Sequence, residues 1–369
     1  MPTKIMRARR IIAQNGTGEI EAFATSGERI VATGGFDALK SRFPDADAIS
    51  LDGVVVPGFN DAHAHLAMAA EDLLHLDFSM KSVRSLAEIK AKIRAEAARR
   101  PKTEWIRGSR YDDAKMSEGR VLSRADLDEV APDHPVMVLH VAGHWGIVNS
   151  KALEAAGITE HSVPPEGGEF GRDAARRLNG ILYEQAIFDF AYPSVAQGGV
   201  SVAPASTPEE RLKGLRRAQE MFHAAGITSL GDALVGPLDL GLFVEAERRG
   251  VLTLRLNALL AVDHYDKLKA TGIKTGFGND RLHVGGIKAF VDGAIGGRTC
   301  LLDEPFEGTD YHGMQTTATN ELRDIVRMAQ EDGNRLCVHC NGDKALKILL
   351  DQFEAAANEF PRPGLRHRI

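Results

Sequence analysis

The sequence predicts an α/β fold of parallel strands joined by helices, and the pattern favours closure into a barrel. From residue 207 onward, segments with helical spacing alternate with short apolar segments. Strands that alternate with helices of this length form βα units around a parallel sheet. The expected helices are residues 208–225, 238–249, 320–332 and 343–358, and the expected strands are residues 227–230, 254–259, 282–290, 336–339 and 366–369.

A second observation is the continuous apolar run at residues 54–59, which is typical of a strand buried on both faces. We interpret this run as the first strand of the barrel. A helix within residues 82–100 follows, and then strands at residues 105–107 and 136–141, before the regular alternation begins.

The first 53 residues predict a separate small unit. Short strands are expected at residues 11–12, 20–24 and 29–32, with turns at Asn15-Gly16 and Ser26-Gly27. So few short strands make less than a typical sheet, and they need partner strands from elsewhere. We therefore divide the chain into residues 1–53 and residues 54–369.

Composition excludes several classes of protein. Of the 369 residues, 43% are hydrophobic and 26% are charged, which are ordinary globular values. The net charge of -6 and the lack of a basic patch argue against nucleic acid as a partner. No apolar run reaches the roughly 20 residues of a membrane span, and charges interrupt the N-terminal segment, as they would not in a signal peptide. Three cysteines in a chain of this length do not make a disulfide framework. We expect a cytoplasmic protein without a membrane or nucleic-acid partner.

His63-Ala64-His65 follows the first predicted barrel strand. Alternate residues of a strand share a face, so both imidazoles can point to one spot at its carboxyl end. Imidazole is a common neutral ligand of zinc and related metals. The alternative is a pair of exposed loop histidines without a metal.

Lys288 lies inside an apolar strand, where a lysine is rare unless it is paired or used chemically. One such use is carboxylation by CO₂ to a carbamate that bridges two metals; the alternative is a lysine that reaches solvent or pairs with Asp292. His339 ends the next strand, where barrel enzymes place catalytic groups. Cys337 and Cys340 form a CxxC pattern around it, which can indicate a zinc or redox site. The two thiols should point to opposite faces of the strand, and the sequence has no second CxxC, so neither kind of site is favoured.

His144, in Gly143-His144-Trp145, follows a strand and precedes a helix start. It either lines a substrate pocket or caps a loop. Together with the stretch from Trp105 to Asp112, this region is where we expect substrate specificity to lie.

The order of these elements resembles the amidohydrolase superfamily, and in particular the branch that includes N-substituted formamide deformylase, called amidohydrolase family 3. The matching stretches are residues 56–65, 143–144 with 149–150, 226–229 with Asp232, 287–293, 338–345 and 367–369. Each stretch is weakly specific by itself, but the combination is specific and spans nearly the whole chain.

The resemblance implies a (β/α)8 TIM-like barrel, of which this chain holds strands one to about six. It also implies an inserted α+β subdomain at about residues 66–220, and an N-terminal half β-sandwich completed by later strands. His63, His65, Lys288 and His339 are the implied ligands of one or two divalent metal ions, zinc being expected, with Lys288 as a candidate N-carboxylysine. We assign catalysis to Lys288, His339 and Asp343, and substrate binding to His144, Trp105 and Asp292.

The resemblance also implies the reaction, which is hydrolysis of a non-peptide C–N bond in a small molecule by metal-activated water. The bond belongs to an amide, N-formyl group, carbamate or cyclic amide. The family's sixth-strand histidine and eighth-strand aspartate have no counterpart here, so we expect a C-terminally truncated chain that binds metal weakly and turns over little.

Other functions stay open at this level. One is a catalytically inactive barrel that acts as a binding or regulatory protein, and another is an isomerase or lyase on the same scaffold, since fold alone does not settle function. Homodimerisation is expected because relatives often dimerise.

Overall fold

The computed structural model describes residues 2–14, 19–196 and 200–369, and the chain divides into two compact units, Met1–Asn60 and Asp61–Ile369. The sequence placed this boundary after residue 53. The predicted turn at residues 15–16 lies outside the described residues. In the described parts of the chain, no helix is both long and apolar enough to cross a membrane.

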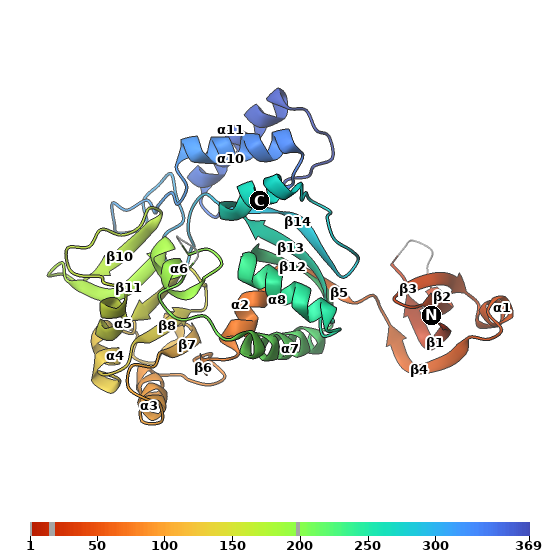
Figure 1. Ribbon diagram of the computed structural model, residues 1–369, viewed down its shortest axis with the longest axis horizontal. Coiled ribbons are helices and arrows are strands. Elements are labelled where there is room, and N and C mark those ends of the chain that lie inside the picture. Colours follow the sequence, from red (N-terminus) through yellow and green to blue (C-terminus); the bar gives the residue numbers. More distant parts are fainter. Residues whose placement is uncertain (1, 15–18, 197–199) are drawn as a thin grey trace. The chain divides into compact units, whose positions relative to one another are not determined.

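The N-terminal unit contains one four-stranded sheet with the order β3-β2-β1-β4 (Figure 1). Strand β1 pairs with β2 in antiparallel and with β4 in parallel orientation, and β2 pairs with β3 in antiparallel orientation. Its elements are β1 (Thr3–Ile12), β2 (Glu19–Ser26), β3 (Arg29–Gly34), α1 (Phe36–Arg42) and β4 (Asp47–Val55). A small core around Ile5 and Leu39 holds α1 against the sheet. The second layer of the predicted sandwich stays a prediction.

The interpretation of residues 54–59 as the first barrel strand was wrong. Residues 54–55 end β4 in the N-terminal sheet, and the barrel strand is β5 (Phe59–Ala64). Val54 and Val56 are about half exposed, at 51% and 48%, so the apolar run is not buried on both faces. Pro57 cannot donate to a ladder, and it separates the two strands. An apolar run therefore did not identify which sheet its residues join.

The larger unit contains a five-stranded sheet with the order β15-β14-β13-β12-β5. The pairings β12–β13, β13–β14 and β14–β15 are parallel, as expected for βα units. Its further strands are β12 (Ile227–Val235), β13 (Arg255–Ala261), β14 (Leu282–Phe290) and β15 (Leu336–His339). Arg368 adds a parallel bridge to Cys337 where the sequence predicted the next strand. This is a partial barrel of the predicted kind.

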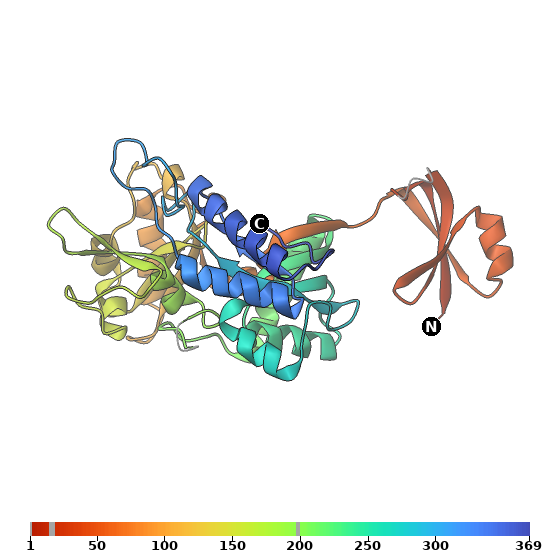
Figure 2. The same cartoon turned by 90° about the horizontal axis from the view of Figure 1, so that it is seen from above.

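Helices cover this sheet, and the sequence explains where they start and stop. They are α2 (Leu66–Asp72), α7 (Pro208–Ala224), α8 (Pro237–Arg248), α9 (Tyr265–Thr271), α10 (Thr319–Asp332) and α11 (Asp343–Glu359). The first turn of α7 is fixed by Pro208 and by a capping box between Thr207 and Glu210. Helix α10 ends at Gly333, whose φ of 76° is the left-handed conformation that glycine adopts without strain. Helices α10 and α11 lie side by side in both views (Figures 1 and 2).

A six-stranded mixed sheet lies between α2 and α7 in the sequence, with the order β10-β11-β9-β8-β7-β6. Its strands are β6 (Leu76–Asp77), β7 (Ile106–Tyr111), β8 (Val136–His140), β9 (Trp145–Val148), β10 (Gly168–Arg172) and β11 (Leu178–Glu184). Its helices are α3 (Leu86–Ala97), α4 (Arg124–Val130), α5 (Ser150–Ala155) and α6 (Gln185–Ala191). Helices α2 and α7 belong to the barrel, because their buried residues, such as Leu215 of α7, lie in one hydrophobic core with Leu256 of β13. The predicted insertion of residues 66–220 had included α2 and most of α7. We call the segment from β6 to α6 the inserted subdomain.

Candidate metal and substrate site

The carboxyl ends of the barrel strands carry the predicted metal ligands, and these line one cavity. His63 lies on β5, Lys288 on β14 and His339 at the end of β15. Together with His65 they line a cavity of about 290 Å³, which His144 of the inserted subdomain also lines. An adjoining cavity of about 250 Å³ shares His63, Lys288 and His339 and extends to Cys337 and Arg368. The fold therefore brings the four residues to one place.

His65 is the first residue after β5 and the N-cap of α2. Its Nδ1 atom is buried and has no hydrogen-bond partner among the described residues. Burial, with smaller effects of His63 and Lys288, lowers the pKa of His65 to about 3. Burial and the charge of Lys288 also lower the pKa of His63. Both rings are therefore neutral at physiological pH, the form in which imidazole binds metals.

Lys288 is buried, with an exposed fraction of 3%. It faces Ala261 of β13 and Cys337 of β15 in the parallel register, and its Nζ lies 4.6 Å from the centroid of the Phe290 ring. In the described residues it makes no ion pair with a carboxylate. Burial lowers the pKa of Lys288 to about 8, so an unusual share of this amine is neutral near physiological pH.

His339 is held by a backbone carbonyl. Its Nε2 lies 3.1 Å from Gly293 O and 3.2 Å from Asn341 Nδ2. The contact with the carbonyl needs the hydrogen on Nε2, and in that tautomer Nδ1 carries the lone pair. Asn341 Nδ2 donates to the same carbonyl at 3.0 Å. Burial, followed by the effects of His144 and Lys288, lowers the pKa of His339 to about 3. A ring fixed in this way is oriented as metal-binding histidines usually are, with the second nitrogen hydrogen-bonded to an oxygen.

His144 is bound to a residue that the sequence did not single out. Its Nδ1 lies 2.7 Å from Glu184 Oε2, and Glu184 Oε1 accepts a 2.5 Å bond from Thr299 Oγ1. Glu184 has an exposed fraction of 1% and a φ of 50°, a strained conformation for a glutamate. Glu184 is 40 residues from His144 and 115 from Thr299, so no local spacing could have revealed this chain.

Three residues predicted for the site do not line these cavities. Trp105 packs against Phe190 with ring centroids 6.5 Å apart. Asp343 is exposed at the start of α11, where its Oδ1 accepts hydrogen bonds from two backbone N–H groups. The Asp292 carboxylate is fully buried and accepts from the backbone N–H groups of Leu301, Asn341 and Gly342 at 2.7–2.9 Å. We therefore replace the predicted substrate contact of Asp292 with a role in holding these two loops.

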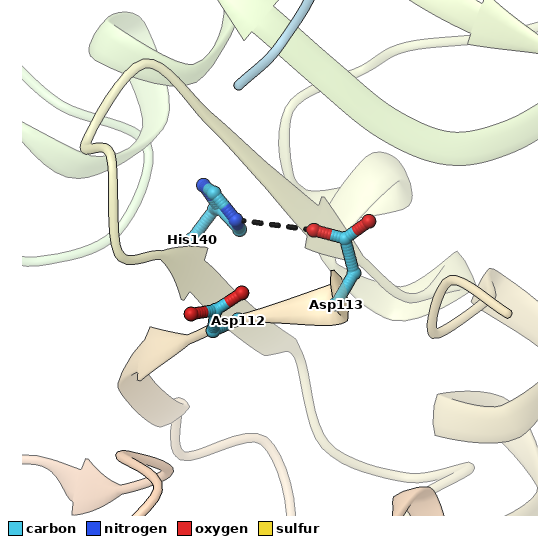
Figure 3. A group of neighbouring side chains, drawn as sticks. All are labelled: Asp112, Asp113 and His140. Carbon is cyan, nitrogen blue, oxygen red and sulfur yellow. Dashed lines mark ion pairs between the residues drawn. The ribbon is translucent and has the colours of Figure 1, made fainter. Parts of the chain in front are cut away.

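A second polar cluster lies in the inserted subdomain (Figure 3). In the described parts of the chain, Asp112, Asp113 and His140 form the one group of three potential ligand residues whose ligand atoms lie within 4.8 Å of one another. His140 Nδ1 accepts from the Ala142 N–H at 3.1 Å, so a neutral ring carries its hydrogen on Nε2. That hydrogen points at Asp113 Oδ1, 3.2 Å away, and it occupies the position that a metal would need. We interpret the cluster as a hydrogen-bonded His–Asp pair that holds the loop before His144.

The fold and the cavity define the class of the protein. It is an α/β protein of barrel type whose site lies at the carboxyl ends of parallel strands, where barrel enzymes carry their active sites.

Comparison with known proteins identifies the family. The amidohydrolase family matches residues 48–369, and the chain belongs to this family. YtcJ of Bacillus subtilis is 32% identical over 92% of this chain and 63% of its own length. N-substituted formamide deformylase of Arthrobacter pascens is 30% identical over 95% of this chain and 65% of its own length. This chain thus spans less than two thirds of either relative. An uncharacterized metal-dependent hydrolase from Pyrococcus furiosus is 26% identical, with a TM-score of 0.67 over 96% of this chain and 70% of that chain.

Proposed function

We propose that this protein is a metal-dependent amidohydrolase that hydrolyses a non-peptide C–N bond of a small molecule. The observation that carries the proposal is the common cavity of His63, His65, Lys288 and His339 at the carboxyl ends of the barrel strands. Family membership and the likeness to a metal-dependent hydrolase support it.

The residues fit a divalent cation. His65 Nδ1 is a buried nitrogen without a partner, which a bound cation would satisfy. His339 presents Nδ1, because its Nε2 is bonded to Gly293 O. Neutral imidazoles suit zinc and similar ions. In the described structure, the ligand atoms of the cavity histidines do not form a group of three within 4.8 Å of one another.

Lys288 suits carboxylation. Its neutral amine would attack the carbon of CO₂, one C–O π bond would open, and a proton would leave the nitrogen, so that a carbamate anion forms. The lowered pKa supplies the neutral amine that this step needs. The carbamate would also replace a buried cation, which repels metal ions, with an anion that attracts them.

The chain's own residues bind and orient the reactants. A bound divalent cation supplies Lewis-acid polarisation of the carbonyl and makes water a better nucleophile. Phe188, Phe290 and Tyr192 wall the cavity with aromatic surface that would hold an apolar substituent and exclude water. His144 is the polar group of the inserted subdomain beside these rings.

Two measurements test the proposal. Metal content is measured for the wild-type chain and for His65→Ala and His339→Ala, with exposed His161→Ala as the control. Affinity is expected to fall on the order of 100-fold in the first two variants. Hydrolysis of N-acyl and N-formyl amines is then followed in ¹⁸O-labelled water, and the acid product is expected to carry one labelled oxygen. Absence of bound metal under replete conditions, or unlabelled product, would contradict the proposal.

A further inference from the structure

The inserted subdomain lines one side of the cavity with Ala142, Gly143, His144 and Phe188, and His144 carries the polar side chain among them. The ring of His144 lies 5.9 Å from Phe188, 6.4 Å from Phe290 and 4.7 Å from His339, measured between ring centroids. His144 thus lies between two phenylalanine rings and the imidazole of His339, whose Nε2 is already in contact with Gly293 O.

The hydrogen bond to Glu184 decides which nitrogen faces the cavity. A carboxylate can only accept, so the hydrogen of the His144 ring sits on Nδ1, 2.7 Å from Oε2. In the neutral ring, Nε2 then carries a lone pair on the opposite side. No described residue donates a hydrogen bond to it.

Glu184 is itself held rigidly. Thr299 donates to Oε1, and Thr299 Oγ1 in turn accepts from the backbone N–H of Ala294 at 2.9 Å. A Cβ on Gly293 would come within 2.3 Å of Glu184 Oε1, so the loop after β14 closes directly on the carboxylate. A buried carboxylate at positive φ with fixed partners is a costly arrangement, and strain of this kind clusters at functional sites.

We propose that His144 is a substrate-positioning residue whose Nε2 accepts a hydrogen bond from the N–H of the scissile amide, and that Glu184 acts through His144 by fixing this tautomer. The inference rests on the proposed function, because it takes an amide as the substrate. It goes further by assigning selectivity: the site prefers amides that carry an N–H over N,N-disubstituted amides.

The expected difference in affinity between the two kinds of amide follows from the loss of one hydrogen bond. An N-methyl group removes the donor and leaves the Nε2 lone pair without a hydrogen bond, and an unsatisfied group of this kind weakens binding on the order of tenfold. The apolar N-substituent would lie on the Phe188 and Phe290 rings in both amides, so the rest of the contact is unchanged.

The first experiment measures binding without turnover. The probes are N-benzylacetamide and N-benzyl-N-methylacetamide, titrated into wild-type protein, His144→Phe and the exposed-residue control His161→Phe. Wild type and control are expected to bind the N–H amide about tenfold more tightly, and His144→Phe is expected to bind both equally. Equal binding by wild type, no binding of either probe, or a preference that survives in His144→Phe overturns the inference.

The second experiment reads the tautomer directly. Nitrogen NMR of ¹⁵N-histidine-labelled wild type should show His144 protonated on Nδ1, and protonation on Nε2 overturns the inference without any variant. In Glu184→Gln, a side-chain amide that turns its N–H₂ toward Nδ1 would shift the hydrogen to Nε2. The amide preference must then disappear with the tautomer, whereas Glu96→Gln, a buried glutamate of α3, must change neither. Loss of preference with an unchanged tautomer refutes the role of Glu184. The binding and NMR measurements do not depend on hydrolysis, so a failure of the proposed reaction can be distinguished from a failure of this inference.

Discussion

Asp232 Oδ2 accepts a 3.0 Å hydrogen bond from the backbone N–H of Ala67, across 165 residues of sequence. Ala67 is the second residue of α2, whose N-cap is His65, so Asp232 satisfies one of the helix's free N–H groups. Asp232 is fully buried on β12. A barrel strand thus fixes the helix whose N-cap is a proposed metal ligand.

Replacing this carboxylate is expected to loosen the start of α2. Asp232→Ala should lower the free energy of unfolding by about 2 kcal/mol, because it leaves a buried N–H without an acceptor. Urea denaturation measures the change, and exposed Asp351→Ala on α11 is the control. Metal affinity should fall with stability, since His65 loses its support. Equal midpoints for Asp232→Ala and the control would show that the cap is dispensable.

The buried amine of Lys288 should make the free energy of unfolding depend on pH in metal-free, CO₂-free protein. Its pKa is about 8 in the folded chain against an ordinary 10.5, so unfolding takes up a proton between these values. Stability therefore rises as pH increases from about 8 to 10.5, and the buried amine destabilises the fold below pH 8. Lys288→Met should be more stable than wild type at pH 7 by up to about 3 kcal/mol, with the difference vanishing near pH 10.5. Denaturation at several pH values measures this, with exposed Lys344→Met as the control; a constant difference would contradict the burial argument.

Asp292 is expected to hold loops rather than substrate. Asp292→Ala removes the acceptor for the N–H groups of Leu301, Asn341 and Gly342 and should lower the free energy of unfolding by about 3 kcal/mol. Asp292→Asn keeps one carbonyl oxygen and should lose less. Hydrogen exchange at Leu301 and Gly342 should rise in the same order. Unchanged exchange combined with weaker substrate binding would instead restore the role predicted from sequence.

The Asp112–Asp113–His140 cluster is expected to bind no catalytic metal. The double variant Asp112→Asn/Asp113→Asn should keep the wild-type metal stoichiometry, because the His140 nitrogen that faces Asp113 carries a hydrogen. Elemental analysis of metal-replete protein measures the stoichiometry. Loss of one full equivalent of metal in this variant would show that His140 adopts the other tautomer and binds an ion.

Much of the barrel pattern is local and could be predicted. The spacing of apolar residues predicted β14 at Leu282–Phe290 and β15 at Leu336–His339 with the bounds that the structure shows. The same alternation places Lys288 and His339 near the carboxyl ends of neighbouring strands, where parallel pairing brings them to one edge. Side-chain periodicity follows from the backbone of each element alone, so a single sequence contains it.

Other features depended on the tertiary structure. The apolar run at residues 54–59 did not reveal that β4 of the N-terminal sheet ends at Val55 and that β5 of another sheet begins at Phe59. Burial depends on which strands pair, and the run itself does not contain that information. The Asp232 cap and the Glu184–His144 bond join residues 165 and 40 positions apart, and no spacing rule reaches that far. The sequence by itself determined which chemical groups stand at the strand ends. Only the folded chain decided which tautomer, partner and neighbour each group has, because hydrogen bonds and burial are set by contacts between distant segments.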